Sequence, residues 1–394
     1  MSIARFGVYV HVPFCASRCD YCDFATWTDR GHLIGGYVDA CVRDVERRAL
    51  APATSVFFGG GTPSLVEAAQ LVRILDAIPR APGAEVTVEC NPDSVDRAKL
   101  DAYAAAGVNR LSLGVQSMRT HVLALLGRTH DPANVTRTVE WARASGFTNI
   151  NLDLIYGTPG ESVDDWKATL DGALALGPSH VSAYALTVEP GTPLGRAVAA
   201  GDRVAPDDDD QAVKYELADD RLHAAGLQWY EISNWARPGH ECRHNLLYWS
   251  QGEYVGIGCA AHGHTLEAEG WACRWWNVRT PDRYLTAIAA GNLPEVGHER
   301  LDPGTREGER LTLGLRTRDG IKLERASAER SPVGLPPVDA CIDELAGAGL
   351  LEVRGEGATL TRRGRLLANE VTARLLASLD ASLGDRAGAP AGTR

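Results

Sequence analysis

Residues 9–22 read Tyr-Val-His-Val-Pro-Phe-Cys-Ala-Ser-Arg-Cys-Asp-Tyr-Cys, so that Cys15, Cys19 and Cys22 directly follow a short segment rich in β-branched residues. Cysteine thiolates are the usual ligands of iron–sulfur clusters, and three of them on one loop can hold three irons while the fourth iron stays open to a small molecule. The alternative is a structural zinc site, which needs four ligands, usually in two pairs. The sequence has no second pair, so the spacing favours a 4Fe-4S cluster held by three cysteines.

Around this motif the composition is that of an ordinary globular protein. The chain has 394 residues, of which 44% are hydrophobic and 23% charged, with a net charge of −11. This length allows one large domain and a smaller one, and the negative charge argues against a basic nucleic-acid surface. No run approaches the roughly 20 apolar residues of a membrane span, and no leader precedes the first strand, so we expect a cytoplasmic protein. The remaining cysteines are expected to be reduced and buried: Cys41, Cys90, Cys242, Cys259, Cys273 and Cys341.

Short apolar runs alternate with helical patterns through the first half of the chain. Apolar residues recur at helical spacing between the runs, and turn residues separate the two kinds of segment. The alternation predicts an α/β fold with about six parallel strands in a partial (β/α)6 barrel. The expected strands are residues 7–12, 55–58, 85–90, 110–115, 148–156 and 180–187.

The pattern changes after the sixth strand. Asp207 and Asp208 are suited to cap a helix that reaches Ala225. Further on, the sequence predicts helices over 306–315 and 337–348, a Gly-turned hairpin over 350–360 and a helix to Leu379, an order that resembles a winged helix. We therefore expect a barrel over 1–235, a connecting segment over 236–300, a winged-helix-like α+β domain over 301–380 and a disordered tail over 381–394.

A winged helix can read DNA, which makes nucleic-acid binding one hypothesis for this tail. The expected recognition helix, 337–348, contains Asp339, Asp343 and Glu344 and no Lys or Arg. Phosphate binding requires the opposite charge. The C-terminal domain is therefore interpreted as a lid or a protein-binding surface, with no nucleic-acid partner.

Polar residues stand where the expected strands end. Residues 59–63, Gly-Gly-Gly-Thr-Pro, follow the second strand, and glycines there let backbone groups approach a ligand closely. Glu89 closes the third strand, Gln116 the fourth, and Asp153 lies in the fifth, while Arg128 could hold a carboxylate with two hydrogen bonds. Each alone is more often a capped loop or a surface ion pair, but together they predict a shared pocket at the carboxyl ends of the strands.

These motifs resemble the radical S-adenosylmethionine (SAM) enzymes, and more narrowly the oxygen-independent coproporphyrinogen III oxidase branch. The resemblance covers residues 3–264 and continues weakly into the tail. It implies that SAM chelates the open iron and that the reduced cluster cleaves SAM to a 5′-deoxyadenosyl radical. It also implies the residues of the SAM pocket, which are Tyr9, Tyr21, Gly60, Gly61, Thr62, Glu89, Gln116, Arg128 and Asp153.

Three features separate a heme-chaperone subgroup of this branch from the true oxidases. The oxidases resemble CxxxCxxCxC, whereas Phe24 stands at the position of the last cysteine here, and Cys15 lies close to the N-terminus. Residues 244–249, His-Asn-Leu-Leu-Tyr-Trp, are similar to the HNxxYW signature of the chaperones, and residues 256–263 to its sequel. The resemblance thus implies delivery of heme to respiratory membrane proteins at the inner face of the membrane, with heme-dependent dimerisation, and leaves radical decarboxylation of coproporphyrinogen as the alternative activity.

A neutral histidine nitrogen can ligate heme iron, and Tyr248 and Trp249 offer flat apolar surface for the macrocycle. The family match makes His244 the first candidate for the heme ligand. Without that match, a buried histidine within an aromatic cluster is the simpler interpretation. His262 and His264, and the thiols of Cys242 and Cys259, are alternatives that the sequence does not separate.

Overall fold

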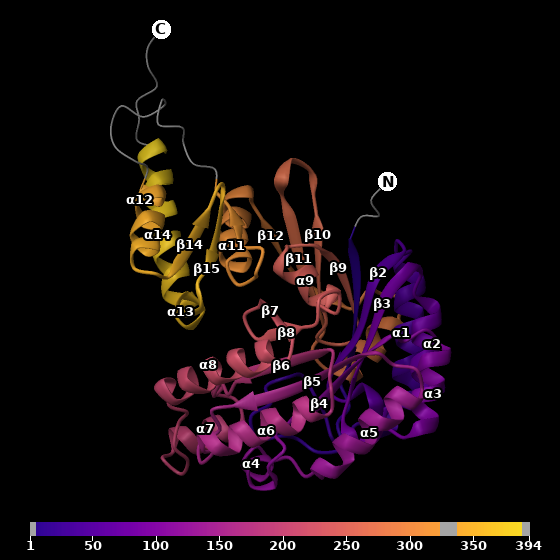
Figure 1. Cartoon of the computed structure of the whole chain (residues 1–394). Coiled ribbons are helices and arrows are strands. Elements are labelled where there is room, and N and C mark those ends of the chain that lie inside the picture. The colour runs from indigo at the N-terminus through magenta and orange to yellow at the C-terminus, as the bar shows by residue number, and fades with distance from the viewer. Residues whose placement is uncertain (1–4, 324–336, 388–394) are drawn as a thin grey trace.

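The computed structural model describes residues 5–323 and 337–387, and its first half is a curved parallel sheet covered by helices (Figure 1). Strands β1 to β6 lie side by side in chain order and all run parallel, which confirms the predicted partial barrel. Their bounds are β1 Phe6–Val12, β2 Ala53–Gly60, β3 Arg80–Cys90, β4 Arg110–Gln116, β5 Asn149–Tyr156 and β6 His180–Ala185. The connecting helices are α1 Ile34–Arg48, α2 Ala68–Ala77, α3 Arg97–Ala105, α4 Thr120–Leu125, α5 Pro132–Ala144, α6 Val163–Ala175 and α7 Pro193–Ala199.

Several of these helices begin at the side-chain caps that the sequence offers. The Asp131 carboxylate accepts a hydrogen bond from the amide of Ala133, and Ser162 and Asp165 form a reciprocal capping box at α6. Asp207 caps α8 (Asp208–Ala224) by accepting from the Asp210 amide at 2.8 Å, as predicted. Such caps satisfy amide groups that the helix itself leaves unpaired.

The sheet has one apolar and one polar face because side chains alternate along a strand. On β1, Val8, Val10 and Val12 are buried in the main core, whereas Tyr9 and His11 point to the concave side. By the register of the strands, polar residues occupy the same concave face on the neighbouring strands, among them Ser55, Glu85, Thr87, Glu89, Arg110, Ser112, Asp153, His180 and Ser182. The interior of the partial barrel is therefore polar.

The sheet continues beyond both ends of the predicted barrel to twelve strands. β9 (Glu253–Ile257) pairs parallel with β1, and β10 (His262–Leu266), β11 (Ala272–Asn277) and β12 (Glu295–Leu301) follow antiparallel. β8 (Asn234–Ala236) and β7 (Gln228–Glu231) extend the other edge beside β6. The segment 236–300, expected as a connection, thus builds sheet, because the open edge of β1 has unpaired backbone groups that another strand satisfies.

Three further helices lie in the chain between β8 and the C-terminal unit. α9 (Arg243–Trp249) holds the HNxxYW sequence, α10 (Pro281–Ala289) packs on α1, and α11 (Pro303–Gly314) leads into the C-terminal unit. There α12 (Pro337–Gly347), β14 (Leu351–Arg354), β15 (Gly357–Leu360), α13 (Arg362–Leu366) and α14 (Ala368–Ala387) follow, with β13 (Ile321–Lys322) completing a three-stranded sheet. The order helix, helix, hairpin, helix agrees with the prediction.

The C-terminal unit has its own apolar core, which includes Leu345, Leu360 and Val371. Arg365, on α13, joins this unit to α8 through an ion pair with Asp219 at 2.9 Å. Figure 1 shows α13 above α8. α14 continues to Ala387, so residues 381–387 are helical where a disordered tail was expected. Ala and Leu favour helix and allow α14 to continue; residues 388–394 lie outside the described part.

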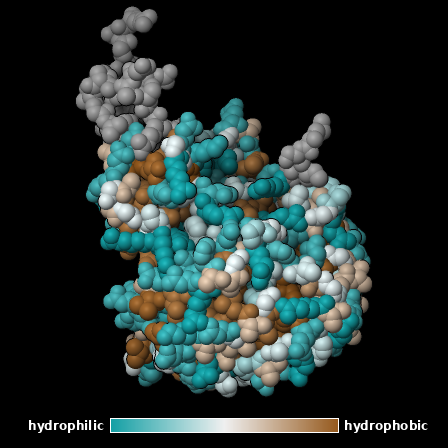
Figure 2. Space-filling model, viewed as in Figure 1, coloured by the Kyte–Doolittle hydropathy of each residue, from teal (hydrophilic) through white to brown (hydrophobic). Residues whose placement is uncertain are grey.

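The described cysteines form no disulfide, and the six outside the motif are buried except for Cys273, which is partly exposed. The face shown in Figure 2 is mostly hydrophilic, with apolar side chains in separate patches. Among the described residues, no helix is both long and apolar enough to cross a membrane.

Candidate functional site

The loop that carries the three cysteines leaves β1 and closes on itself. The Trp27 amide donates to the Pro13 carbonyl at 2.8 Å, and the Cys15 amide donates to the Trp27 carbonyl at 3.1 Å. The loop is also held from outside, since the Asp20 amide donates to Leu126 O and the Asp20 carbonyl accepts from the Leu194 amide. Closure of this kind keeps all three thiols within a short, anchored stretch of chain.

The glycine-rich loop after β2 lies directly against the cysteine loop. The amides of Gly61 and Thr62 donate to the carbonyls of Val12 and Phe14, each at 2.8 Å. A Cβ atom at Gly61 would lie 2.7 Å from the Phe14 carbonyl oxygen and 3.1 Å from the Cys15 sulfur. Only glycine fits there, so the glycines bring the two loops together.

The three thiols are the donors that a three-cysteine cluster would need. All three are free and partly exposed. Burial raises the pKa of Cys15 and of Cys22, and the negative charge of Cys19 adds to both shifts, which places the three groups within electrostatic reach of one another. Within residues 5–323 and 337–387 no His, Cys, Asp or Glu side chains converge as a finished metal site. The residues nevertheless fit a cluster in the chemistry of their donors, since iron binds thiolates and would offset their mutual repulsion.

Two groups of the residues predicted for SAM flank this loop. In the first, the Gly60 amide donates to the Glu89 carboxylate at 3.2 Å, and Asp153 accepts from Ser112 Oγ at 2.7 Å and from Asn151 Nδ2 at 2.8 Å. Burial, with the nearby charge of Asp153, raises the pKa of Glu89 to about 8. The carboxyl groups of Glu89, on β3, and of Asp153, on β5, thus lie close enough for the charge of one to affect the pKa of the other.

In the second group, Arg128 Nε and Nη2 both donate to the Tyr21 hydroxyl at 3.3 Å. A Cβ atom at Gly114 would lie 3.1 Å from Gln116 Nε2 and 3.4 Å from an Arg128 nitrogen, so both side chains pass close to the end of β4. Tyr21 belongs to the cysteine loop itself. The structure therefore brings these residues to the same edge of the sheet as the thiols.

The interior of the partial barrel contains buried polar atoms without partners in the described structure, including Thr87 Oγ1, Glu231 Oε1 and Asn234 Oδ1. Buried polar atoms normally make hydrogen bonds, and each missing bond costs about 1–3 kcal/mol. Such atoms are suited to receive a small polar molecule. Together with the carboxylates of Glu89 and Asp153 and the guanidinium of Arg128, this polar interior fits the chemistry of the amino, ribose and carboxylate groups of SAM.

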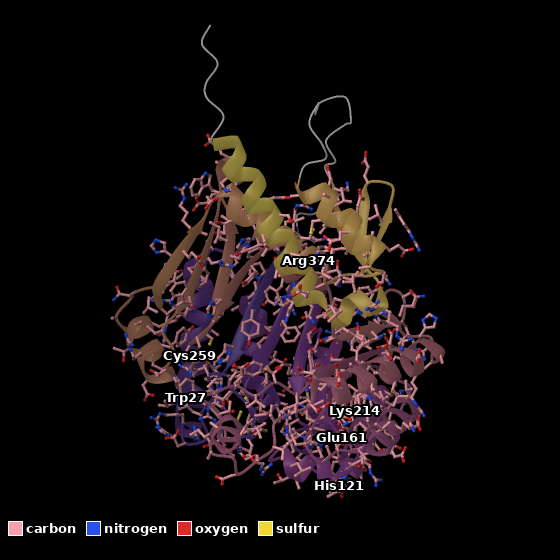
Figure 3. The ribbon with its side chains drawn as sticks, turned by 90° about the vertical axis from the view of Figure 1, so that its left-hand side faces the viewer. Trp27, His121, Glu161, Lys214, Cys259 and Arg374 are labelled. Carbon is pink, nitrogen blue, oxygen red and sulfur yellow. The ribbon has the colours of Figure 1, made fainter. Side chains whose placement is uncertain are left out.

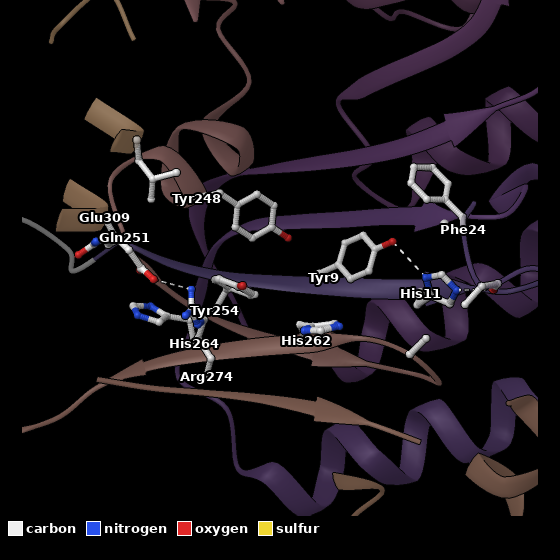
Figure 4. Close-up of a pocket in the computed structure, with 14 residues that line it drawn as sticks. Tyr9, His11, Phe24, Tyr248, Gln251, Tyr254, His262, His264, Arg274 and Glu309 are labelled. Carbon is white, nitrogen blue, oxygen red and sulfur yellow. Dashed lines mark hydrogen bonds and ion pairs between the residues drawn. The ribbon is translucent and has the colours of Figure 1, made fainter. Parts of the chain in front are cut away.

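A cavity of about 440 Å³ opens between β1, the cysteine loop, β9 to β11 and α11 (Figure 4). Phe24, which is 59% exposed, reaches it from the cysteine loop, and Tyr248 reaches it from α9. Two of the three features that distinguished the heme-chaperone subgroup in the sequence, Phe24 and the HNxxYW segment, therefore meet at one cavity. Its other lining residues are Tyr9, His11, Ala25, Gly60, Gln251, Tyr254, Ala260, His262, His264, Arg274, Glu309 and Leu313.

His244 lies behind the wall of this cavity and does not line it. Its side chain is buried, with Nδ1 2.9 Å from Ser55 Oγ and Nε2 2.8 Å from the Tyr248 hydroxyl. Burial, followed by the positive charge of Arg110, lowers the pKa of His244 to about 3, so the ring is neutral. The Glu85 carboxylate accepts from the His244 amide at 3.2 Å, as expected for an acid at a helix N-terminus.

Of the alternative heme ligands, Cys242 and Cys259 are buried away from the cavity, with contacts to Glu85 and Tyr37 respectively. His262 and His264 line the cavity. The sequence analysis did not single out Tyr254, Arg274 or Glu309. The alternation of residues 253–257 was the available signal for Tyr254, but nothing local indicated that this strand pairs with β1.

Gly60 provides a test of how the two loops fit. Its φ is +106°, and a Cβ atom would lie 2.4 Å from His11 Nδ1. We expect Gly60→Ala to lower the free energy of unfolding by more than the roughly 1–2 kcal/mol that left-handed backbone alone costs a residue with a Cβ atom. Gly83→Ala is the control, because Gly83 has φ +72° but nothing within 4 Å of a Cβ atom. Equal losses in urea unfolding of the two variants would contradict the proposed steric contact.

The chain is similar in sequence to known proteins over most of its length. Residues 9–173 match the Radical SAM superfamily and residues 301–367 the HemN C-terminal domain. The chain is 45% identical to the heme chaperone HemW of Mycobacterium tuberculosis, over 94% of this chain and 95% of that protein. It is 34% identical to HemW of Bacillus subtilis, over 95% of this chain and all of the relative.

The fold also matches a solved structure, coproporphyrinogen III oxidase (HemN) of Escherichia coli. The TM-score is 0.78 at 23% identity, and the match covers 94% of this chain and 90% of that chain. This likeness establishes the fold only. Since the sequence identity to the HemW proteins extends over almost the whole chain, the protein belongs to the HemW family of the radical SAM superfamily.

Proposed function

We propose that this protein is a heme chaperone, which binds heme and delivers it to heme-requiring respiratory apoproteins while carrying a SAM-coordinated 4Fe-4S cluster on Cys15, Cys19 and Cys22. The names of its HemW relatives support the proposal. The observation that carries it is the cavity at which Phe24 and Tyr248 meet. A cavity at this position gives a common purpose to two of the three sequence features that set the chain apart from the oxidases, Phe24 and the HNxxYW segment.

The chemistry of the cavity suits heme. Tyr9, Phe24, Tyr248 and Tyr254 offer aromatic surface to a flat macrocycle, and histidines stand among them. The Tyr248 and Tyr254 rings pack edge to face with centroids 4.6 Å apart, which gives this wall a defined shape. Neutral imidazole is a common ligand of heme iron.

The cavity also adjoins the cysteine loop. Phe24 and Ala25 belong to that loop, and His11 Nε2 lies 2.9 Å from the Ala25 carbonyl. Bound heme would therefore lie next to the cluster and SAM, since Tyr9 and Gly60, which were predicted for the SAM pocket, also line the cavity. This arrangement supports a regulatory or supporting role for the cluster.

For the cluster and SAM, the cysteines would supply three thiolate ligands. Glu89, Asp153 and the backbone of the glycine-rich loop would hold polar groups of SAM, and Arg128 would hold its carboxylate. When bound, this pair supplies one-electron cleavage of SAM to a 5′-deoxyadenosyl radical. The chain's own contribution is to fix the cysteine loop and to hold the Glu89 carboxylate against the Gly60 amide.

The proposal places the protein in the cytoplasm, where it would meet its membrane-bound clients at the inner face of the membrane, as a monomer or a heme-dependent homodimer. No nucleic-acid partner is included, because the acidic residues of α12 would repel phosphate.

The test is anaerobic reconstitution with iron and sulfide, followed by two titrations. We expect hemin to bind with one-to-one stoichiometry and to pass to an apo-form of a heme-requiring respiratory protein. We expect coproporphyrinogen III with SAM and a reductant to yield no protoporphyrinogen under conditions in which a known oxidase is active. Failure to bind hemin, or turnover of the porphyrinogen, would overturn the proposal, and turnover would assign the chain to the oxidases.

A further inference from the structure

The histidines in and around the cavity differ in which of their ring nitrogens are free. His11 contacts the Tyr9 hydroxyl through Nδ1 at 3.2 Å and the Ala25 carbonyl through Nε2 at 2.9 Å. His244 contacts Ser55 and Tyr248 through its two nitrogens. Neither ring can ligate a metal without breaking a hydrogen bond in a buried environment, which is costly.

His264 has one nitrogen committed. Its Nδ1 lies 2.9 Å from the Gly252 carbonyl, and its ring, 5% exposed, stacks on Tyr254 with centroids 6.2 Å apart. It lies near the end of the cavity closed by the ion pair of Arg274 with Glu309 at 2.8 Å. A histidine oriented by a carbonyl is a reasonable metal ligand in general, so His264 is the competing candidate.

His262 has neither nitrogen committed. It lines the cavity, its side chain is exposed, and no hydrogen bond joins its ring to any residue in the described part of the chain. Figure 4 shows it below Tyr9, between Tyr254 and His11. Although His262 is open to solvent on one side, its partial burial, followed by the positive charge of Arg274, lowers the pKa of the ring, which favours the neutral form.

The HNxxYW sequence then has a different role. Because His244 Nε2 lies 2.8 Å from the Tyr248 hydroxyl, it fixes the position of an aromatic ring that lines the cavity. The His244 and Tyr248 rings are also packed edge to face, with centroids 4.9 Å apart. His244 acts on the cavity through Tyr248.

We propose that His262 is the protein ligand of the heme iron, and that His244 is a positioning residue that orients Tyr248 against the macrocycle. This assignment rests on the proposed heme-chaperone function. The bond formed is a dative one from an imidazole nitrogen to ferric iron, so no electron or proton is transferred. The cavity histidine with both nitrogens free, rather than the histidine of the signature, meets the iron.

The experiment compares ferric-hemin complexes of the full-length wild type, His262→Ala, His262→Gln, His264→Ala and His244→Ala. Absorption and electron paramagnetic resonance report whether an imidazole ligates the iron. We expect both His262 variants to lose the imidazole signature and to bind hemin at least about tenfold more weakly, since even an outer-sphere partner of a metal ligand contributes that much. Added imidazole should restore the signature in His262→Ala. His244→Ala should keep the ligation and bind hemin more weakly.

His121 supplies the control for nonspecific binding by surface histidines. It is exposed, pairs with Asp165 on the helical surface, and lies far from Cys259 in Figure 3. His121→Ala should match the wild type. An unchanged imidazole signature in both His262 variants, or its loss in His264→Ala or His244→Ala alone, would overturn the assignment while leaving heme binding intact. Absence of hemin binding by the wild type would instead overturn the proposed function.

Discussion

Cys19→Ser is expected to leave the protein unable to assemble its cluster. Cys19 is the middle cysteine of the motif, and its charge raises the pKa of both Cys15 and Cys22, so it stands within reach of each. A serine hydroxyl is a far weaker ligand of iron than a thiolate, and two remaining cysteines cannot hold three irons. After anaerobic reconstitution, iron and sulfide content and the visible absorption of the cluster should fall to background.

Cys273→Ser is the matched control for this experiment. Cys273 is also partly exposed and free, but it lies on β11, where its sulfur donates to the adjacent Arg274 carbonyl at 3.7 Å. This variant should assemble the cluster like the wild type. Wild-type iron content in Cys19→Ser, or equal losses in both variants, would show that the motif does not hold the cluster as proposed.

Lys214→Met is expected to cause the largest loss of stability. Lys214 Nζ lies 3.2 Å from Glu161 Oε2, 2.6 Å from Asp210 and 2.7 Å from the Glu161 carbonyl oxygen, and the Lys214 and Glu161 side chains are fully buried (Figure 3). Removing one partner of such a pair leaves an uncompensated charge, which costs about 3–5 kcal/mol. Because Glu161 also accepts from the Gly157 amide, the loop after β5 should loosen. Urea unfolding of the apoprotein measures the loss.

The loss should depend on pH. Burial raises the pKa of Glu161, and Lys214 opposes that shift. Without Lys214 the folded-state pKa rises further above the value of about 4.3 in the unfolded chain, so the folded state binds a proton more readily. The protonated Glu161 therefore stabilises the folded variant fully below about pH 4.3, and this stabilisation is lost as the pH rises through the folded-state pKa. Lys214→Met should accordingly be less destabilised at pH 5 than at pH 8.

Lys167→Met is the control that distinguishes the loss of a buried ion pair from the loss of a surface lysine. Lys167 pairs with Asp164 at 2.9 Å on the surface of α6, where the side chains are 41% and 89% exposed. Solvent screens exposed pairs, which contribute about 0–1 kcal/mol. A comparable loss in the two variants, or no pH dependence in Lys214→Met, would contradict the proposed burial effect.

The six parallel strands were predictable because their signal is local. Each is a short apolar run bounded by turn residues, and Asp131, Ser162 and Asp207 mark helix starts within a few residues. The cysteine loop and the glycines after β2 are equally local. The spacing of the cysteines alone predicted the three cluster ligands. The contacts between Gly61 and the cysteine loop became visible only in the structure.

The extension of the sheet was not predictable in the same way. β9 pairs with β1 across more than two hundred residues of chain, and no local pattern names a distant partner. Because no such partner could be named, the sequence predicted a connecting segment over 236–300, where the structure has strands that extend the sheet. The role of His244 was hidden for a related reason: a motif shows which residue types are adjacent, but not which face of α9 is buried.

The sequence by itself determined the order of the barrel strands and helices and the resemblance to a family, and it predicted three thiolate donors, because covalent spacing and side-chain periodicity carry that information. Only the tertiary structure decided that Phe24 and Tyr248 line one cavity and that His244 is buried with both nitrogens occupied while His262 is free. These properties depend on which distant surfaces pack together, and burial and hydrogen-bond partners are settled by that packing.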